Sequence, residues 1–525
     1  MSGSSEKAKS GAGVARNAAI VGSWTGVSRV LGLVREMMTS RVFGTSALQS
    51  AFVLAFQIPN LFRKLFGEGA LSSAFIPAFT ESLEKESKQD SERFARRMLT
   101  LLGLGLSAIV LVGIAALFVI EPFMPDTFRY KDAFPLIRIM LPYAPLICMT
   151  AITMGVLNAL HEFKAPAATT SLLNVVWISA LAILMPLTSL SDETRLRIVS
   201  WAILFAGFLQ FAYLWIVLRR MGWIIMPDLA FRRDPRIRKV CLDTLPIAMS
   251  SAVTQVNLLV DNLFALNAAT WAAASISYAE RIIYLPLGVI ATAYSTVLLP
   301  VFSRQYAAKD EDAMKRTLDG ALAGMLVPMI PAAFGIAVLA EPVTYVIYGG
   351  GAFTSESATH VARALSCYAF GLPFFGLQKS LTQFFFGRHD KRTPVTISMA
   401  CVGVNFALNL TFFLVLPTSW KHAGIALATS LSAMLSTLLL FVAMHRTTTI
   451  RPDYRSFVRT IVTTIVSAVV MASAAMAVHD ALSRTEAPFI MRVVVLAASV
   501  ATGAACYAAI LALLNPRAVR SLLRR

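Results

Sequence analysis

The sequence predicts an all-α polytopic membrane protein with about 14 transmembrane helices, from its composition, segment lengths and hydropathy pattern. The chain has 525 residues, of which 57% are hydrophobic and 14% charged, and its mean hydropathy is +0.67. A soluble domain is about 45–50% apolar and about 25% charged. The apolar segments run about 20–28 residues each, long enough for tilted helices across a hydrocarbon core of ~30 Å. They lack the alternating period of outer-membrane strands.

Fourteen apolar spans can be drawn between the polar loops. They are approximately 15–40, 46–82, 97–122, 133–160, 166–188, 195–219, 239–268, 273–305, 320–348, 358–386, 393–416, 422–445, 455–481 and 488–514. One alternate set of loops holds about 31 Lys and Arg, whereas the opposite set holds about seven or eight. Because cytoplasmic loops carry the positive excess, this asymmetry predicts that both termini are cytoplasmic.

The charged and reactive residues exclude several classes of protein. The net charge of +18 is distributed over alternate loops, which follows the positive-inside bias and argues against nucleic acid as a partner. The five cysteines and six histidines are scattered without metal-ligand spacing, and the cysteines are interpreted as small buried hydrophobes. No nucleotide motif or catalytic triad is present. We therefore expect a non-enzyme without a cofactor, which draws on an ion gradient or the membrane potential unless it only equilibrates its substrate.

Two recurring motifs indicate that the chain contains two repeated halves. The pattern R-x4-YA at 138–144 returns at 363–369, and IPAF at 76–79 returns as LPVF at 299–302. The offsets are 225 and 223 residues. Because six spans per repeat give both halves the same orientation, we expect a pseudo-two-fold axis along the membrane normal with a cleft between the lobes.

The most basic loop lies between the two halves and supports two interpretations. It is either a segment lying on the anionic cytoplasmic leaflet or, more commonly, a linker that obeys the positive-inside bias. The expected organisation is a disordered basic N-terminus (1–14), an N-lobe with spans 1–6 (15–219), a basic cytoplasmic linker (220–238), a C-lobe with spans 7–12 (239–445), spans 13 and 14 (455–514) and a basic C-terminal tail (515–525).

Charged residues within the first two spans point to a binding site inside the membrane. Arg29, Arg35, Arg63 and Glu68 lie within or close to apolar runs. A cation at the bilayer centre costs roughly 2.5–3.5 kcal/mol even on lenient insertion scales. We therefore expect these arginines to line a water-filled cavity that binds an anion.

Each of these residues also has a structural interpretation. Arg35 could snorkel to the membrane interface, and on a straight helix it diverges from Arg29 by roughly 120°. Pro59 predicts a kink one turn before Arg63, in the form that transporters use to build mid-membrane sites. Glu68 could alternatively form a structural ion pair with Arg63 or with its neighbour Lys64.

The second half contributes further intramembrane polar residues. We expect Arg281 to complement the arginines of the first half, and we group the adjacent Glu280 with it as a substrate-binding candidate, although the two side chains point about 100° apart. Asp261 could coordinate a cation, pair with an arginine or relay protons. With Asn405 and Asn409, one turn apart, it forms a conceivable cation site of oxygen ligands. Helix–helix hydrogen bonding is the more common role of such asparagines.

Several long motifs resemble the MurJ (MviN) family of lipid II flippases, within the multidrug/oligosaccharidyl-lipid/polysaccharide exporter superfamily. They are SRVLGLVRE, FQIPNLFRKLFGEGALSSAFIPAF, SYAERIIYLPLGV with TVLLPVFSR, and the stretch from GGGAFT to FFFGRHDKRTPV. The resemblance implies a two-lobed, V-shaped fold of fourteen helices that works by alternating access. It also implies that spans 13 and 14 form a groove for the polyprenyl tail.

The resemblance assigns roles to individual residues, with two departures. The family's cavity arginines fall on Arg29, Arg35, Arg63 and Arg281, and its acid after the kink falls on Glu68. Many members carry Thr-Asp where this chain has Gln49-Ser50. The sodium site reported for some members matches Asp261, Asn405 and Asn409, but the last of these stands where an acid would strengthen the match.

The leading hypothesis is a flippase that carries lipid II from the inner to the outer leaflet of the bacterial cytoplasmic (inner) membrane. Arginines can hold its pyrophosphate through charge-assisted hydrogen bonds while the lipid tail stays in the bilayer. The alternative is a related exporter of another polyprenyl-linked glycan or of drugs, although an arginine-lined cavity has the wrong sign for cationic drugs. We expect a monomer with lipid II and membrane lipids as partners, no nucleic acid, and sodium or protons as the possible coupling ion.

Overall fold

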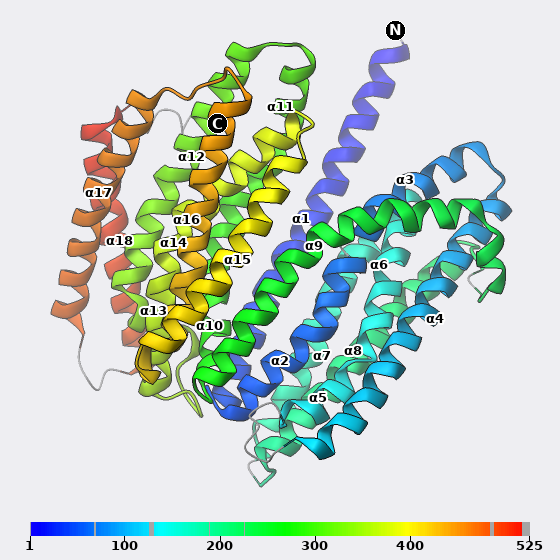
Figure 1. The fold of residues 1–525 in the computed structure, drawn as a ribbon, viewed down its shortest axis with the longest axis horizontal. Helices are drawn as coiled ribbons and strands as arrows, with labels where there is room; N and C mark the ends of the chain where they lie inside the picture. Colours follow the sequence, from blue (N-terminus) through cyan, green and yellow to red (C-terminus); the bar gives the residue numbers. More distant parts are fainter. Residues whose placement is uncertain are drawn as a thin grey trace. The chain divides into compact units, whose positions relative to one another are not determined.

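The computed structural model describes residues 2–67, 70–124, 131–187, 189–224, 226–483 and 488–516. They fold as helices (Figure 1), and the described residues contain no strand beyond one isolated bridge between Gly350 and Phe353. The chain divides into two units, Met1–Leu259 and Val260–Arg525. The all-α class predicted from composition is therefore confirmed.

The first unit contains nine helices and three short helical turns in its described part. They are α1 (Ser2–Phe43), α2 (Ala47–Phe62), the π-helix η1 (Arg63–Gly67), α3 (Ala70–Lys85), α4 (Lys88–Ile120), η2 (Glu121–Phe123), α5 (Ala133–Met140), α6 (Tyr143–Ala159), α7 (Lys164–Leu184), α8 (Asp192–Arg220), η3 (Leu229–Arg233) and α9 (Pro235–Ala268). The last of these, α9, continues into the second unit.

The second unit contains the remaining helices. They are α10 (Ala272–Pro286), the π-helix η4 (Leu287–Ala291), α11 (Thr292–Ala307), α12 (Glu311–Val338), α13 (Ala340–Tyr348), α14 (Ser355–Gly387), α15 (Arg392–Val415), α16 (Thr418–Thr447), α17 (Tyr454–Leu482) and α18 (Phe489–Leu514). Within this unit α17 and α18 pack against each other and α17 packs on α12. The Tyr507 hydroxyl of α18 donates a hydrogen bond to the Val327 carbonyl of α12 at 2.5 Å.

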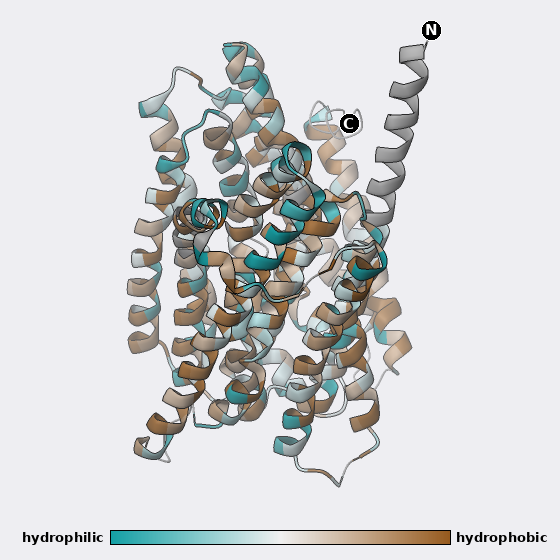
Figure 2. Ribbon diagram, turned by 90° about the vertical axis from the view of Figure 1, so that its right-hand side faces the viewer, coloured by the Kyte–Doolittle hydropathy of each residue, from teal (hydrophilic) through white to brown (hydrophobic). Residues whose placement is uncertain are grey.

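Ten helical segments in the described residues are long and apolar enough to cross a membrane. They are Lys88–Phe123, Ala133–Ala159, Lys164–Leu184, Asp192–Arg220, Ala272–Ala307, Glu311–Val338, Arg392–Val415, Thr418–Thr447, Tyr454–Leu482 and Phe489–Leu514. Apolar residues extend along most of the length of the long helices (Figure 2). All fourteen predicted spans fall on helical segments, but the number of membrane crossings stays a prediction.

The N-terminal segment 1–14 differs from its expected disorder. Helix α1 begins at Ser2, so the backbone from that residue onward is helical. The segment contains two Ala and two Lys, which are good helix formers, but also three Gly and four Ser, which are weaker ones. Adding residues to an existing helix avoids the unfavourable nucleation step. Composition alone therefore underestimated helix propagation from the adjoining span.

Two of the predicted spans are interrupted in the same manner. In the first unit η1 follows α2, which contains Pro59. In the second unit η4 directly follows Pro286, the last residue of α10. Proline donates no backbone hydrogen bond, and π-turns of this kind bend helices. The two π-helices begin 224 residues apart, at Arg63 and Leu287, which agrees with the offsets of the sequence motifs.

The glycine motif at 349–354 forms a turn and a helix start. Gly350 and Gly351 have φ angles of +113° and +60°, a region that residues with a Cβ rarely adopt. The amide of Phe353 donates to the carbonyl of Gly350 at 3.1 Å. Thr354 then caps α14 by accepting a hydrogen bond from the amide of Ser357.

A network of ion pairs attaches the linker to the start of α4. The guanidinium of Arg97 lies 3.1 Å from both Asp228 and Asp234. Arg236 contacts Asp234 at 2.8 Å and also pairs with Glu86. Burial alone would raise the pKa of Asp234, but hydrogen bonds from Arg236 and Arg97 outweigh it and hold the pKa below its ordinary value. The linker is therefore fixed within the first unit by charge-assisted contacts.

Replacing Asp234 by asparagine should lower stability at neutral pH by about 1–2 kcal/mol, since hydrogen bonds to charged groups contribute about 1.5–3 kcal/mol and this network is partly exposed. A carboxyl with a lowered folded-state pKa contributes stability above its unfolded pKa of about 3.9, and this is lost as the pH falls through the folded value. Melting temperatures of the wild type and Asp234→Asn should therefore differ at pH 7 and converge below about pH 3.9. The exposed Glu84→Gln is the control, and a pH-independent difference would contradict the assignment.

Candidate functional site

Arg35 is buried in the first unit and bonded to its neighbours. Its side chain on α1 is 7% exposed. One guanidinium nitrogen donates to Asn174 Oδ1 on α7 at 3.1 Å, and another contacts Glu36 Oε1 at 2.5 Å. The guanidinium also lies 4.4 Å from the centre of the Trp177 ring. Arg35 therefore joins α1 to α7 and has part of its charge balanced by Glu36.

Arg29 lies on the same helix in a different environment. Its side chain is exposed, whereas Arg35 is buried, as expected from their divergence around the helix. The side-chain amide of Asn174, which contacts Arg35 through its oxygen, donates to the carbonyl of Ser28, next to Arg29, at 3.1 Å. Because an exposed cation is unfavourable in lipid, the exposure of Arg29 suits the water-filled cavity expected from the sequence.

Arg63 is the first residue of η1, directly after the helix that contains Pro59. Its Nε donates to Asn60 Oδ1 at 2.8 Å, and its side chain is half-buried. This bond orients the guanidinium from one turn earlier in the chain. Glu68 lies outside the described residues, so the alternative of an ion pair with Arg63 or Lys64 stays open.

Arg281 and Glu280 lie on α10 in the second unit. Arg281 is exposed and Glu280 is half-buried. The hydroxyl of Tyr368 on α14 donates to Glu280 Oε1 at 3.2 Å. The adjacent side chains thus differ in environment, as their helical spacing predicts. Because Arg281 belongs to a different unit from Arg29, Arg35 and Arg63, the convergence of the four arginines stays a prediction.

Lys379 is a cation within the predicted apolar span 358–386 that the sequence analysis did not single out. It lies on α14, eight residues before the helix ends at Gly387, and its side chain is exposed. The neighbouring Gln378 donates to Ser436 on α16 at 3.0 Å. The insertion-cost argument applied to the arginines would also have identified this lysine.

Asp261 is surrounded by amide and hydroxyl groups inside the second unit. Its side chain is 3% exposed. The Asn409 amide lies 2.5 Å from one carboxylate oxygen, and the Thr429 hydroxyl lies 3.3 Å from the other. The Asn409 amide also donates to Asn405 Oδ1 at 2.9 Å. The structure thus brings together the three residues predicted as a cation site.

The fourth residue of this cluster, Thr429 on α16, was missed because threonine is common in membrane helices and its spacing carries no signal. The cluster combines one carboxylate with neutral oxygens from α15 and α16. Oxygen ligands suit hard cations. A single carboxylate balances one positive charge, so the donor set fits a monovalent cation better than a divalent one.

The contacts of Arg35 predict a structural effect that Arg29 does not share. Arg35→Ala should lower the free energy of unfolding by on the order of 3 kcal/mol, because removing one partner leaves a buried charged neighbour uncompensated. Arg29→Ala, at an exposed position, should change it by less than about 0.5 kcal/mol. Thermal unfolding of the purified variants checks this. Equal melting temperatures for Arg35→Ala and the wild type would contradict the buried ion pair.

The chain is similar to known proteins over most of its length. The family profile described as "Lipid II flippase MurJ" matches residues 39–498. A protein of Rhizobium tropici named "Probable lipid II flippase MurJ" is 33% identical over 435 residues, covering 81% of this chain and 80% of that protein. "Lipid II flippase MurJ" of Burkholderia cenocepacia is 30% identical over 441 residues, covering 82% of this chain and 84% of that protein.

Solved structures show the same fold. A structure titled "Lipid II flippase MurJ, inward closed conformation" matches with a TM-score of 0.77 and 23% identity, covering 95% of this chain and 100% of that one. An inward-facing multidrug resistance MATE family transporter matches with a TM-score of 0.61 and 16% identity, covering 80% of this chain and 96% of that one. With ten apolar helices long enough to cross a membrane, the protein is a multi-pass inner-membrane protein, and it belongs to the MurJ family.

Proposed function

We propose that this chain is a lipid II flippase, which moves its substrate from the inner to the outer leaflet of the cytoplasmic membrane by alternating access. The observation that carries the proposal is the family match over residues 39–498. The intramembrane arginines supply the chemistry that such a substrate requires. The molecule is a transporter, so no bond of the substrate is made or broken.

The arginines divide into exposed and supporting groups. Arg29 and Arg281 are exposed, and their planar guanidinium groups bind pyrophosphate oxygens through paired, charge-assisted hydrogen bonds. Arg63 is oriented by Asn60 and adds a third donor group. Arg35 is bonded to Glu36 and Asn174. It therefore acts by positioning α1 and by adding positive potential rather than by direct contact with the substrate.

The polyprenyl tail remains in the bilayer, along α17 and α18, while the head group crosses. Keeping the tail in hydrocarbon avoids exposing it to water, which would cost about 0.8 kcal/mol per CH₂ group. The polar sugar and peptide then occupy the water-filled surroundings of the intramembrane arginines. Binding the doubly anionic head group offsets the electrostatic repulsion among the arginines. It therefore favours closure of the transporter on one side of the membrane.

The coupling ion binds at Asp261, Asn405, Asn409 and Thr429. Sodium is the first candidate because the cluster offers one carboxylate and neutral oxygens, and a proton on Asp261 is the second. The ion supplies a charge that neutralises the carboxylate, and its gradient drives the return of the empty transporter. The membrane potential acts on the net positive cavity in the same cycle.

Both termini and the linker lie in the cytoplasm, and the protein acts as a monomer. The loop charge asymmetry supports this topology. When fused to the linker or the C-terminus, a reporter that is active only in the cytoplasm should give a signal. A reporter that is active only outside the cytoplasm should give none, and a signal from it would overturn the topology.

Depletion in cells tests the function directly. Cells that depend on this protein should accumulate lipid II in the inner leaflet after depletion, where an external lipid II-cleaving toxin cannot reach it. Re-expression should restore cleavage. Unchanged cleavage after depletion, in cells without another flippase, would reject the proposal.

A further inference from the structure

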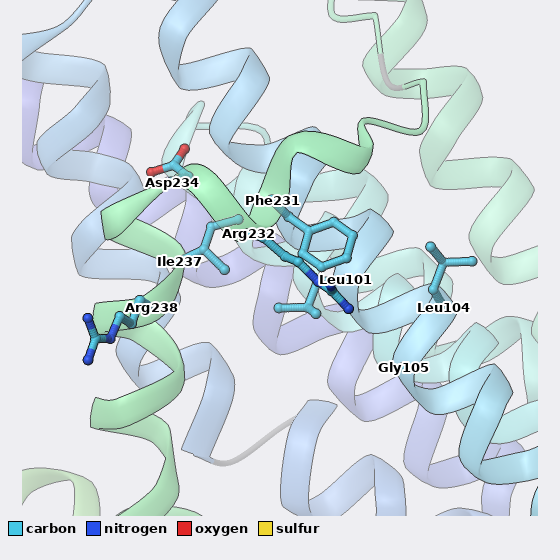
Figure 3. Close-up of a pocket in the computed structure, with 8 residues that line it drawn as sticks. All are labelled: Leu101, Leu104, Gly105, Phe231, Arg232, Asp234, Ile237 and Arg238. Carbon is cyan, nitrogen blue, oxygen red and sulfur yellow. The ribbon is translucent and has the colours of Figure 1, made fainter.

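A groove of about 640 Å³ lies within the first unit, between α4 and the linker (Figure 3). Leu101, Leu104 and Gly105 of α4 form one side. The other side is formed by the linker and the first turn of α9, through residues Phe231, Arg232, Asp234, Ile237 and Arg238. The proposed transport mechanism uses none of these residues.

The apolar side of the groove continues into an exposed apolar surface of α4. Leu104 is 52% exposed, and Leu111 and Val112 farther along α4 are 66% and 70% exposed. These side chains lie on a helix long and apolar enough to cross the membrane. A Cβ built on Gly105 would meet no atom within 4 Å, so the groove has open space at that position. It therefore lies where the polar and basic first turns of α4 give way to apolar ones.

The arginines around the groove are of two kinds. Arg97 and Arg236 are bonded to Asp234, so this carboxylate is already neutralised. Arg232 and Arg238 are exposed, and neither side chain forms a hydrogen bond or ion pair with any residue that the structure describes. Figure 3 shows the Arg232 guanidinium beside Leu101 and Phe231, with Arg238 on the other side of Ile237. The groove therefore presents uncompensated positive charge beside an apolar surface.

The linker also carries exposed apolar side chains next to these charges. Ile224, Met226 and Leu229 are 56%, 59% and 71% exposed. Apolar side chains interleaved with arginines are typical of segments that lie at the membrane interface. This second observation places the groove at the depth of the phospholipid head groups.

We propose that the groove binds an anionic glycerophospholipid of the cytoplasmic leaflet. Its phosphate contacts Arg232, with Arg238 as a second source of positive charge. One acyl chain lies along Leu101 and Leu104 over the open space at Gly105. Charge complementarity selects an anionic over a zwitterionic lipid, and the apolar wall selects a lipid over a soluble phosphate. The bound lipid ties the linker to α4 beside the network of Arg97 and Asp234.

Native mass spectrometry of the full-length protein with added phosphatidylglycerol or phosphatidylethanolamine tests this proposal. The wild type should retain phosphatidylglycerol preferentially. Arg232→Gln and Arg238→Gln should each weaken this binding roughly fivefold, as expected for one basic residue near an anionic surface. Arg220→Gln removes an equal charge from an exposed residue outside the groove and should leave binding unchanged.

A second pair of variants tests the groove without changing charge. Gly105→Leu fills the open space and should reduce phosphatidylglycerol binding at an unchanged melting temperature. Gly403→Leu, at another glycine with open space, should not. Glycerol phosphate should fail to displace the lipid.

Three results would overturn the proposal. The first is unchanged lipid preference in Gly105→Leu or in the double arginine variant. The second is an equal loss in Arg220→Gln, which would indicate general surface charge. The third is stoichiometric displacement of phosphatidylglycerol by lipid II, which would make the groove an entry site for the transported substrate.

Discussion

Replacing Arg29 or Arg281 by alanine is expected to abolish growth of cells depleted of their own lipid II flippase, at an unchanged level of the protein in the membrane. Both side chains are exposed, so their removal should leave the fold intact. Each lost charge-assisted hydrogen bond to pyrophosphate corresponds to about 1.5–3 kcal/mol. This is roughly a 10- to 100-fold loss in substrate binding, which is too large for a growing cell wall to tolerate.

The conservative variants and a control separate charge from geometry. Arg29→Lys and Arg281→Lys should restore growth only in part, because an ammonium keeps the charge but loses the planar pair of donors. Lys421→Ala removes a cation from the first turn of α16, where it lies 4.3 Å from the Phe413 ring, and should grow normally. Normal growth of Arg29→Ala and Arg281→Ala at normal expression would mean that these charges are dispensable for binding.

Asp261→Asn is expected to eliminate any stabilisation of the purified protein by sodium. If sodium binds only the folded protein, a concentration of 100 times its dissociation constant stabilises by about 2.7 kcal/mol. Asparagine keeps the shape and hydrogen bonding of the side chain but removes the charge that attracts the cation. The measurement is the melting temperature in sodium chloride compared with potassium and choline chloride at equal ionic strength.

Asn409→Ala should act on the same cluster by a different route. It removes the amide that lies 2.5 Å from the Asp261 carboxylate, and loss of a hydrogen bond to a buried charged group corresponds to about 1.5–3 kcal/mol. Asn267→Ala is the matched control, because Asn267 is exposed on α9, the helix of Asp261, and its amide donates to the Leu263 carbonyl one turn earlier at 3.0 Å. A wild type that responds identically to all three salts would remove sodium as the coupling ion and leave protons or the membrane potential.

The features predicted from sequence are those with a strong local energetic cause. Burying charge in hydrocarbon is expensive, so the sequence alone singles out Arg29 and Arg281 as candidates for anion binding. Proline interrupts a helix wherever it lies in the interior, so the bend after Pro59 was predictable. The helical repeat angle separated Arg29 from Arg35, and their different exposure confirms this separation.

The remaining features depend on packing between distant segments. The bond from Arg35 to Asn174 joins residues 139 positions apart, and no local pattern identifies such a pair. Thr429 reaches Asp261 across 168 positions for the same reason. Arg97 is the first residue of a predicted apolar span (97–122), and its role in fixing Asp228 and Asp234 follows only from the folded linker.

The most direct test is lipid II translocation in reconstituted vesicles. Purified wild-type protein, in vesicles that contain labelled lipid II and a sodium gradient, should raise the rate at which inner-leaflet lipid II becomes accessible to an external cleaving enzyme. The Arg29→Ala/Arg281→Ala double variant should match protein-free vesicles. A wild type that does not exceed protein-free vesicles, or a double variant as fast as the wild type, would contradict the arginine-based flippase mechanism.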